Sequence, residues 1–269
     1  MNDTISSQAL LDDARQWALA AGEIQLGYFR SDRLDIRAKL NDSDVVTAAD
    51  KAAERLILDS IHAKYPTHSI LSEESGADTH DSPYRWIIDP LDGTTNFSAG
   101  LPMFSVSIGL EYCGKMLLGV VYAPYLREMF HAVKGCGAFL NGTPIHPSST
   151  DRLSHAVVAT GFPVDKDTSP DCNLDNVARV LPSVRGMRRL GSAAIDLCYV
   201  AAGYLDAYWE LNLHPWDVAA GSIIIAEAGA RLTHFRHDRN LSVMASNPSL
   251  HPAILPLLSS EPHTTPIKI

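Results

Sequence analysis

Hydrophobic residues near the start of the chain recur at steps of three and four positions, which is the spacing of one face of an amphipathic helix. They are Leu10, Leu11, Ala14, Trp17, Ala18, Ala21, Ile24 and Tyr28. A polar stretch follows, and the segment Thr47–Asp50 then opens a second run with helical spacing, which ends near Tyr65. This part of the chain therefore predicts two helices, each with one buried face.

Short runs of residues that favour β-strands come next. They cover Ser69–Ser72, Tyr84–Ile88, Phe104–Tyr112, Lys115–Tyr122, Glu128–Val133 and Ala138–Leu140. Gly114, Pro124 and the Asn141-Gly142 pair separate the later runs, and residues of these types form the tight turns that join antiparallel strands. The pattern predicts an antiparallel sheet.

Strand-like and helix-like runs alternate after the polar segment Pro147–Thr150. The expected strands are His155–Thr160, Gly186–Leu190 and Leu205–Glu210, and the expected helices are near Cys172–Leu181, at Ser192–Ala202 and at Asp217–Ala228. Such alternation is typical of α/β proteins. We therefore predict an N-terminal α+β lobe over residues 1–147 and a C-terminal α/β lobe over residues 148–269.

The chain has 269 residues and a formal net charge of −9, which argues against nucleic acid or a membrane surface as partner. The same charge would repel a phosphorylated ligand unless cations are bound at the site. The four cysteines form no CxxC pair, so we expect reduced thiols and no zinc site. The N-terminus is polar and acidic, and no run approaches the roughly 18 apolar residues of a spanning helix. These features predict a cytoplasmic protein.

One acidic segment, Asp89–Phe97, directly follows the apolar run Trp86–Ile88. Its two carboxylates, Asp89 and Asp92, would lie on a rigid turn at the end of a buried strand and could both face one cation, a hard oxygen site suited to Mg²⁺. If Thr94 begins a helix, the N–H groups there can bind an anion. Ordinary surface turns use the same residues, so this segment alone leaves both interpretations open.

Three further acidic residues have two interpretations each. Glu73, in the pair Glu73-Glu74, can be a metal ligand or part of a solvated loop. Asp217 begins a run of small helical residues, where it can be a ligand or a helix N-cap. Asp50 follows Thr47 by three positions, so it can serve the site or form a capping box.

Together these segments resemble the inositol monophosphatase family. The stretches DPLDGTTNF (Asp89–Phe97) and WDVAAG (Trp216–Gly221) are similar to the two signature motifs of the family, and SEES (Ser72–Ser75) stands at the place of its glutamate. The resemblance extends from the first helix to about Ser246. It implies a layered αβαβα sandwich of the sugar-phosphatase type, with an antiparallel sheet in the N-terminal half and a mixed α/β C-terminal half.

The resemblance also implies two to three Mg²⁺ ions. Glu73, Asp89 and the carbonyl group of Leu91 would hold the first ion, and a weaker third ion would lie near Glu73. Asp89, Asp92 and Asp217 would hold the second ion. The implied catalytic residues are Asp50, Thr94 and Glu73, with Thr94 and Asp50 orienting the attacking water and accepting its proton.

Substrate contacts are implied in two places. The phosphate would lie near Gly93 and the residues of the metal site, and the alcohol near Gly191 and Glu210. The full implied set is Asp92, Gly93, Thr94, Gly191, Ser192, Ala193, Glu210 and Asp217. From the residues alone, Gly191 can belong to a plain strand-to-helix turn, and Glu210 can be a solvated strand end. Arg188 and Arg189 could reach an anion or be surface charge.

The implied function is Mg²⁺-dependent hydrolysis of small phosphate monoesters of polyols or sugars, above all of inositol 1-phosphate, by a metal-activated water. The implied protein is a lithium-sensitive homodimer. Within the family, fructose 1,6-bisphosphate, 3′-phosphoadenosine 5′-phosphate and histidinol phosphate are alternative substrates. An alternative from another class is a regulatory binding protein with vestigial phosphatase activity. Lost metal ligands would be its signature, and none is lost here.

Overall fold

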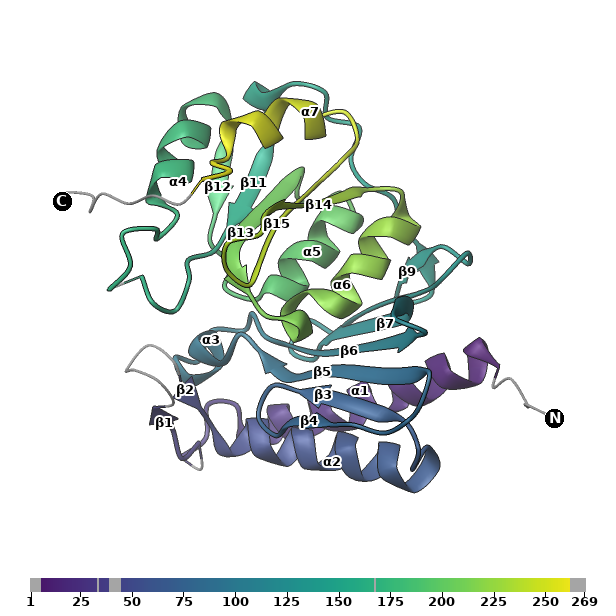
Figure 1. Cartoon of the computed structure of the whole chain (residues 1–269). Coiled ribbons are helices and arrows are strands. Elements are labelled where there is room, and N and C mark those ends of the chain that lie inside the picture. Colours follow the sequence, from purple (N-terminus) through teal and green to yellow (C-terminus); the bar gives the residue numbers. More distant parts are fainter. Residues whose placement is uncertain (1–5, 33, 39–44, 167, 262–269) are drawn as a thin grey trace.

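Five layers of helix and sheet make up the protein, as a computed structural model shows for residues 6–32, 34–38, 45–166 and 168–261 (Figure 1). The first layer contains α1 (Ser7–Tyr28) and α2 (Ala48–Lys64). Their apolar faces pack together and onto the first sheet, with Trp17 and Ile57 in one buried cluster with Trp86. A small hairpin of β1 (Arg37–Ala38) and β2 (Val45–Val46) precedes α2.

The second layer is an eight-stranded sheet with the order β10-β9-β8-β7-β6-β5-β3-β4. Its strands are β3 (Ser69–Ser72), β4 (Gly76–Asp78), β5 (Tyr84–Asp92), β6 (Ser105–Tyr112), β7 (Lys115–Ala123), β8 (Glu128–Val133), β9 (Ala138–Leu140) and β10 (Thr143–Pro144). All neighbouring strands are antiparallel except β3 and β5. This pair is parallel because the chain turns back through β4 before β5 begins.

The middle layer consists of α5 (Ala193–Ala201) and α6 (Pro215–Ala228), which lie between the two sheets (Figure 1). Glycines on the first sheet let α6 approach closely. A Cβ atom added at Gly119 would lie 2.5 Å from the carbonyl oxygen of Ala220, and one at Gly109 would lie 3.0 Å from Cβ of Ala219. This close packing brings the start of α6 to the end of β5, where the acidic segments meet.

The fourth layer is a five-stranded sheet with the order β12-β11-β13-β15-β14. Its strands are β11 (Val157–Thr160), β12 (Gly186–Arg188), β13 (Ala207–Leu213), β14 (Arg231–Arg236) and β15 (Leu241–Ser246). β11 pairs in parallel with β12 and β13, and the other pairs are antiparallel. The sheet is therefore mixed.

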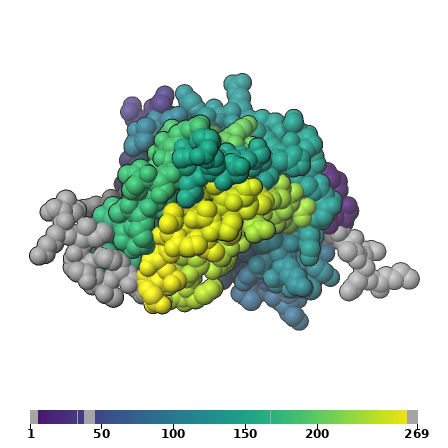
Figure 2. Space-filling model, turned by 90° about the horizontal axis from the view of Figure 1, so that it is seen from above, coloured from purple at the N-terminus to yellow at the C-terminus, as the bar shows by residue number. Residues whose placement is uncertain are grey.

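The outer layer contains α4 (Leu174–Val180) and α7 (His251–Ile254), with the 3₁₀ turns Leu153–His155, Leu181–Ser183 and Leu255–Leu257. Figure 2 shows this outer surface, with the yellow C-terminal segment lying across it. The fifth layer completes the αβαβα sandwich, so the predicted fold class is confirmed. The division into lobes at residues 147 and 148 stays a prediction.

Two expectations from composition can be compared with the structure. All four cysteines are free thiols, and only Cys198 is fully buried. No helix in the described part of the chain has both the length and the apolar character needed to cross a membrane.

Strands β14 and β15 lie outside the predicted elements.

Candidate metal centre

The acidic segment after Ile88 continues β5 and does not form the predicted turn. Asp89 pairs with Ser107, and Asp92 pairs with Ser105. The interval of three residues between the aspartates on β5 therefore lies opposite an interval of two residues on β6. This is a β-bulge, and Pro90 is tolerated there because a bulge leaves one residue outside the ladder. The predicted end of the strand at Ile88 was therefore wrong, and the bulge spaces the two aspartates.

Gly93 makes the sharp turn after the strand. Its φ of 92° lies in the left-handed region, and a Cβ atom there would lie 2.8 Å from the carbonyl oxygen of Met103. Both features require glycine. The helix α3 (Thr94–Ser98) starts at the next residue, which confirms that Thr94 begins a helix.

Asp217 lies at the third position of α6, because the helix begins at Pro215. Its carboxylate accepts a hydrogen bond from the backbone N–H of His214 (2.7 Å). The N-cap interpretation of Asp217 was therefore wrong: His214 is the N-cap, and Asp217 closes a capping box. The box satisfies one unpaired N–H group and fixes the direction of the carboxylate.

Asp89, Asp92 and Asp217, here called the aspartate triad, come together although they lie on a strand and a distant helix. One carboxylate oxygen from each lies within 4.8 Å of the others. Burial, together with the neighbouring carboxylates, raises the pKa of Asp92 to about 6 and raises the pKa of Asp89 and Asp217 well above the usual range. In the described residues, no arginine or lysine forms an ion pair with the triad. Three hard oxygen donors with uncompensated charge fit a divalent cation such as Mg²⁺.

Glu73 lies beside the triad, and its charge raises the pKa of each triad member. The loop that carries it is held by the buried Glu54 of α2. The carboxylate of Glu54 accepts hydrogen bonds from the hydroxyl group of Ser72 (2.5 Å) and from the backbone N–H of Ser75 (3.0 Å). Glu54 thus fixes both ends of the Ser72–Ser75 segment, a role that sequence reasoning missed.

Asp50 forms the predicted capping box and also contacts Thr94, because its two carboxylate oxygens have separate partners. Its role in the site stays a prediction. Oδ2 accepts from the backbone N–H of Thr47 (2.8 Å), which forms the capping box. Oδ1 accepts from the hydroxyl group of Thr94 (3.1 Å), and this hydroxyl also lies 3.0 Å from the carbonyl oxygen of Leu91. Burial raises the pKa of Asp50 to about 6. The cap therefore holds the carboxylate against the residue predicted to orient water.

The Gly191–Ala193 segment lies against the end of β5. Oδ2 of Asp92 accepts hydrogen bonds from the hydroxyl group of Ser192 and from the backbone N–H of Ala194 (2.8 Å). Asn96 extends the connection, since its side-chain amide donates to the carbonyl oxygen of Leu190 (2.7 Å). The start of α5 is thereby fixed to the triad. Ser192 directs its hydroxyl to Asp92, and its predicted substrate contact stays a prediction.

Glu210 lies inside β13, so the predicted strand end at this residue was wrong. The strand continues to Leu213 because it pairs with β15, with an irregularity after Glu210. The hydroxyl group of Tyr208 donates to the carboxylate (2.6 Å). Burial raises the pKa of Glu210 to about 7. The side chain is therefore no solvated strand-end charge.

A cavity of about 470 Å³ connects these groups. Its lining includes Glu73, Asp92, Arg189, Gly191, Ala193, Glu210, Trp216 and Asp217. Predicted metal ligands and predicted alcohol-binding residues therefore share one cavity. Asp50, Asp89 and Thr94 are not among its lining residues.

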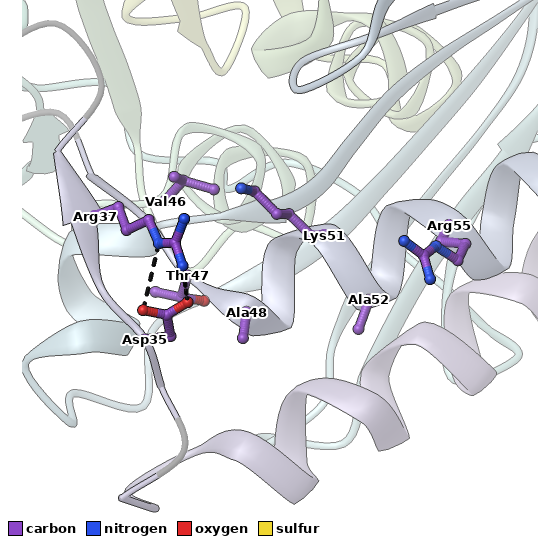
Figure 3. A pocket seen from close by; sticks show the side chains of 8 residues that line it. All are labelled: Asp35, Arg37, Val46, Thr47, Ala48, Lys51, Ala52 and Arg55. Carbon is purple, nitrogen blue, oxygen red and sulfur yellow. Dashed lines mark hydrogen bonds and ion pairs between the residues drawn. The ribbon is translucent and has the colours of Figure 1, made fainter.

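A second, smaller cavity of about 280 Å³ lies along α2 (Figure 3). Arg37, Lys51 and Arg55 line it, and Arg37 is paired there with Asp35 (2.7 Å). None of the predicted site residues lines this cavity. We therefore place the chemistry in the larger one.

The comparisons with known proteins agree with this geometry. Residues 7–263 match the model of the inositol monophosphatase family. An inositol-1-monophosphatase from Synechocystis is 40% identical over 260 residues, which cover 95% of this chain and 90% of that protein. A protein named Nus factor SuhB from Pasteurella multocida is 43% identical over 228 residues, covering 84% of this chain and 85% of that protein.

Solved structures give the same result. The inositol monophosphatase from Anabaena matches with a TM-score of 0.83 and 40% identity, covering 95% of this chain and 97% of that one. The extragenic suppressor protein suhB from Bartonella henselae matches with a TM-score of 0.85 and 36% identity, covering 93% and 98%. Fold and site thus define a protein of the metal-dependent phosphatase type. The chain belongs to the inositol monophosphatase family.

Proposed function

We propose that this protein is a Mg²⁺-dependent phosphatase of small phosphate monoesters, with inositol 1-phosphate as its main substrate. The observation that carries the proposal is the aspartate triad, three converging carboxylates with which no arginine or lysine of the described residues forms an ion pair. Membership of the family and the 40% identity to an inositol-1-monophosphatase support this substrate.

Glu73, Asp89 and the carbonyl group of Leu91 would hold one ion, and Asp89, Asp92 and Asp217 a second. Bound Mg²⁺ would neutralise the phosphoryl oxygens, lower the pKa of a bound water and stabilise the leaving oxygen. The protein's part is to keep the carboxylates apart at fixed positions. The bulge in β5, the capping box of Asp217 and the hydrogen bonds to Asp92 do this.

Thr94 and Asp50 would handle the proton of the attacking water. The hydroxyl group of Thr94 already donates to Asp50, so its oxygen lone pairs can accept a hydrogen bond from water. The proton can then pass through Thr94 to Asp50, whose pKa of about 6 suits a general base near neutral pH. We infer no covalent phosphoenzyme.

The alcohol would lie near Gly191, Ala193 and Glu210, which line the cavity together with Asp92 and Asp217. The Glu210 carboxylate can accept hydrogen bonds from vicinal hydroxyl groups. Gly93 and the start of α3 would face the phosphate.

The direct test is phosphate release from a panel of inositol 1-phosphate, fructose 1,6-bisphosphate, 3′-phosphoadenosine 5′-phosphate and histidinol phosphate. We expect inositol 1-phosphate to have the highest kcat/KM and to require Mg²⁺. Lithium should inhibit at millimolar concentration, and light scattering should give a dimer mass. No release from any of the four substrates would overturn the proposal.

A second candidate function is favoured by the relatives named Nus factor SuhB, such as the one 43% identical to this chain. We propose that the chain can also bind a protein of the transcription machinery. Gel filtration of the purified protein with RNA polymerase tests this, and we expect co-elution. Separate elution at micromolar concentrations would contradict it without affecting the phosphatase proposal.

A further inference from the structure

Arg188 and Arg189 are neighbours in the sequence and both are exposed, but only Arg189 lines the 470 Å³ cavity. Arg188 ends β12 and is exposed, and its Nη1 donates to the carbonyl oxygen of Met187 (3.1 Å). Arg189 lines the 470 Å³ cavity together with Asp92 and Glu210. Successive side chains of an extended chain point to opposite sides, which separates the two arginines.

Two glycines leave space for charged groups in this cavity. A Cβ atom added at Gly191 would lie 2.1 Å from Nη1 of Arg189, and Gly191 has a φ of +90°. A Cβ atom at Gly161 would lie 1.9 Å from Oε2 of Glu210. The guanidinium group and the carboxylate are therefore each seated over a residue without a side chain. They face the same space, on the side where the alcohol would lie.

No protein partner explains the place of the Arg189 guanidinium group: within residues 6–32, 34–38, 45–166 and 168–261 it forms no hydrogen bond or ion pair. Arg189 is also the one arginine or lysine among the described residues that line the cavity. Its charge acts on the carboxyl groups of Glu210 and Asp196. Glu210 already accepts from Tyr208, so Arg189 is not needed to hold it.

We propose that Arg189 is a specificity-determining residue that binds a second anionic group, a carboxylate or a phosphate, carried by the leaving group of the substrate. This inference rests on the proposed function. In the proposed function the ions at the triad balance the charge of the scissile phosphate, which leaves the guanidinium group for another anion. Its planar fork can bind either anion through two parallel hydrogen bonds. Inositol 1-phosphate would contact only Glu210, whereas an acidic sugar phosphate would contact both Glu210 and Arg189.

Three probes share one ester and differ only at carbon 6: α-D-glucose 1-phosphate, α-D-glucuronic acid 1-phosphate and α-D-glucose 1,6-bisphosphate. Loss of the 1-phosphate is followed with saturating Mg²⁺ for the wild type, Arg189→Gln and Arg188→Gln. We expect the wild type to prefer at least one charged probe over glucose 1-phosphate by about tenfold or more in kcat/KM. Arg189→Gln should lower this preference by about ten- to a hundredfold. Arg188→Gln is the matched control and should keep it.

Preference for the carboxylate probe or for the bisphosphate identifies which anion the cavity takes. The inference is overturned if the wild type prefers neither charged probe, or if the two variants behave alike. It is also overturned if Arg189→Gln lowers kcat/KM equally for all three probes, because Arg189 would then act only through Glu210 or the fold.

Titration calorimetry with Ca²⁺ in place of Mg²⁺ separates this inference from the proposed function, since Ca²⁺ accepts the same oxygen ligands. Tighter binding of a charged probe than of glucose 1-phosphate, lost in Arg189→Gln and kept in Arg188→Gln, supports the inference even if no phosphate is released. Equal binding of the three probes by the wild type overturns it even if the phosphatase is active.

Discussion

Two groups of aspartates, each with at least one buried member, differ in what balances their charge. In one group, here called the arginine-paired cluster, Arg236 binds Asp171 (3.0 and 2.6 Å) and Asp238 (2.9 and 2.6 Å), and Arg239 binds Asp165. Hydrogen bonding to Arg236 lowers the pKa of Asp238. In the aspartate triad no described arginine or lysine plays this part, and the pKa of each carboxyl group is raised.

The difference separates structural acids from acids kept for a ligand. Buried carboxylates with fork-shaped arginine partners are neutralised by the chain itself. Buried carboxylates without such partners cost free energy in the folded protein. The triad is nevertheless held in place by a strand bulge and a capping box. The fold holds the triad in place although the triad lowers its stability, which indicates that the triad binds a cation that is not part of the chain.

The largest contrast is expected in stability. Asp171→Asn should lower the free energy of unfolding by about 3 kcal/mol, because it removes one of the two carboxylates that bind the buried Arg236 and leaves only Asp238. Asp89→Asn, measured with chelator, should lower it by less than about 1 kcal/mol or raise it, because it removes repulsion. Urea unfolding of both variants gives the values. Equal losses would show that the two groups of aspartates do not differ.

For activity, the larger loss is expected from a change in the triad. Asp217→Asn should lower kcat/KM by at least about a hundredfold for every substrate, because it removes a ligand of the second ion. Asp59→Asn, an exposed change of the same type on α2, is the control and should keep wild-type activity. Phosphate release measures both. An active Asp217→Asn variant would remove Asp217 from the metal site.

Glu210 sharpens the comparison within the cavity, because it is an acid assigned to the alcohol and not to a metal. Glu210→Gln should lower the ratio of kcat/KM for inositol 1-phosphate to that for p-nitrophenyl phosphate by about ten- to a hundredfold. The ester without ring hydroxyls lacks the lost contacts. An unchanged ratio would mean that Glu210 does not select the leaving group.

A smaller effect should appear with pH. Burial raises the pKa of Asp50 and Asp92 from 3.8 to about 6 in the folded protein. Between these values the folded, metal-free protein binds more protons than the unfolded chain, so its stability falls as pH rises from about 4 to about 6. Mg²⁺ competes with protons for the triad, so it should raise the Tm more at pH 8 than at pH 5. Equal shifts at the two pH values would contradict this.

Periodicity predicted most of the helices and strands because they depend on local pattern, and the family resemblance predicted the triad. The steps of three and four gave α1 and α2, and the strand runs gave β3 to β9 apart from β4. Two signature motifs identified Asp89, Asp92 and Asp217 as residues of one site. Of the two capping boxes, the one in α2 was predicted, because Thr47 and Asp50 have the required spacing.

Features that depend on tertiary pairing were not predicted. β13 extends past Glu210 because β15 pairs with it, and β15 lies outside the predicted elements. Glu54 was missed because its serine partners lie in a distant loop. A signal was present: Asp50, Glu54 and Ile57 follow the helical spacing of one buried face of α2. Arg188 and Arg189 could not be told apart until β12 gave their directions.

The central claim is that the triad is completed by Mg²⁺, and the most direct measurement is Mg²⁺ binding linked to unfolding. The stability of the wild type and of Asp89→Asn is measured by urea unfolding across a Mg²⁺ titration, with phosphate release followed in the same samples. At about 100 times its Kd, Mg²⁺ should stabilise the wild type by about 2.7 kcal/mol. It should do little for Asp89→Asn, and chelation should abolish wild-type activity. Full activity after exhaustive chelation, or equal stabilisation of both proteins, would contradict the account.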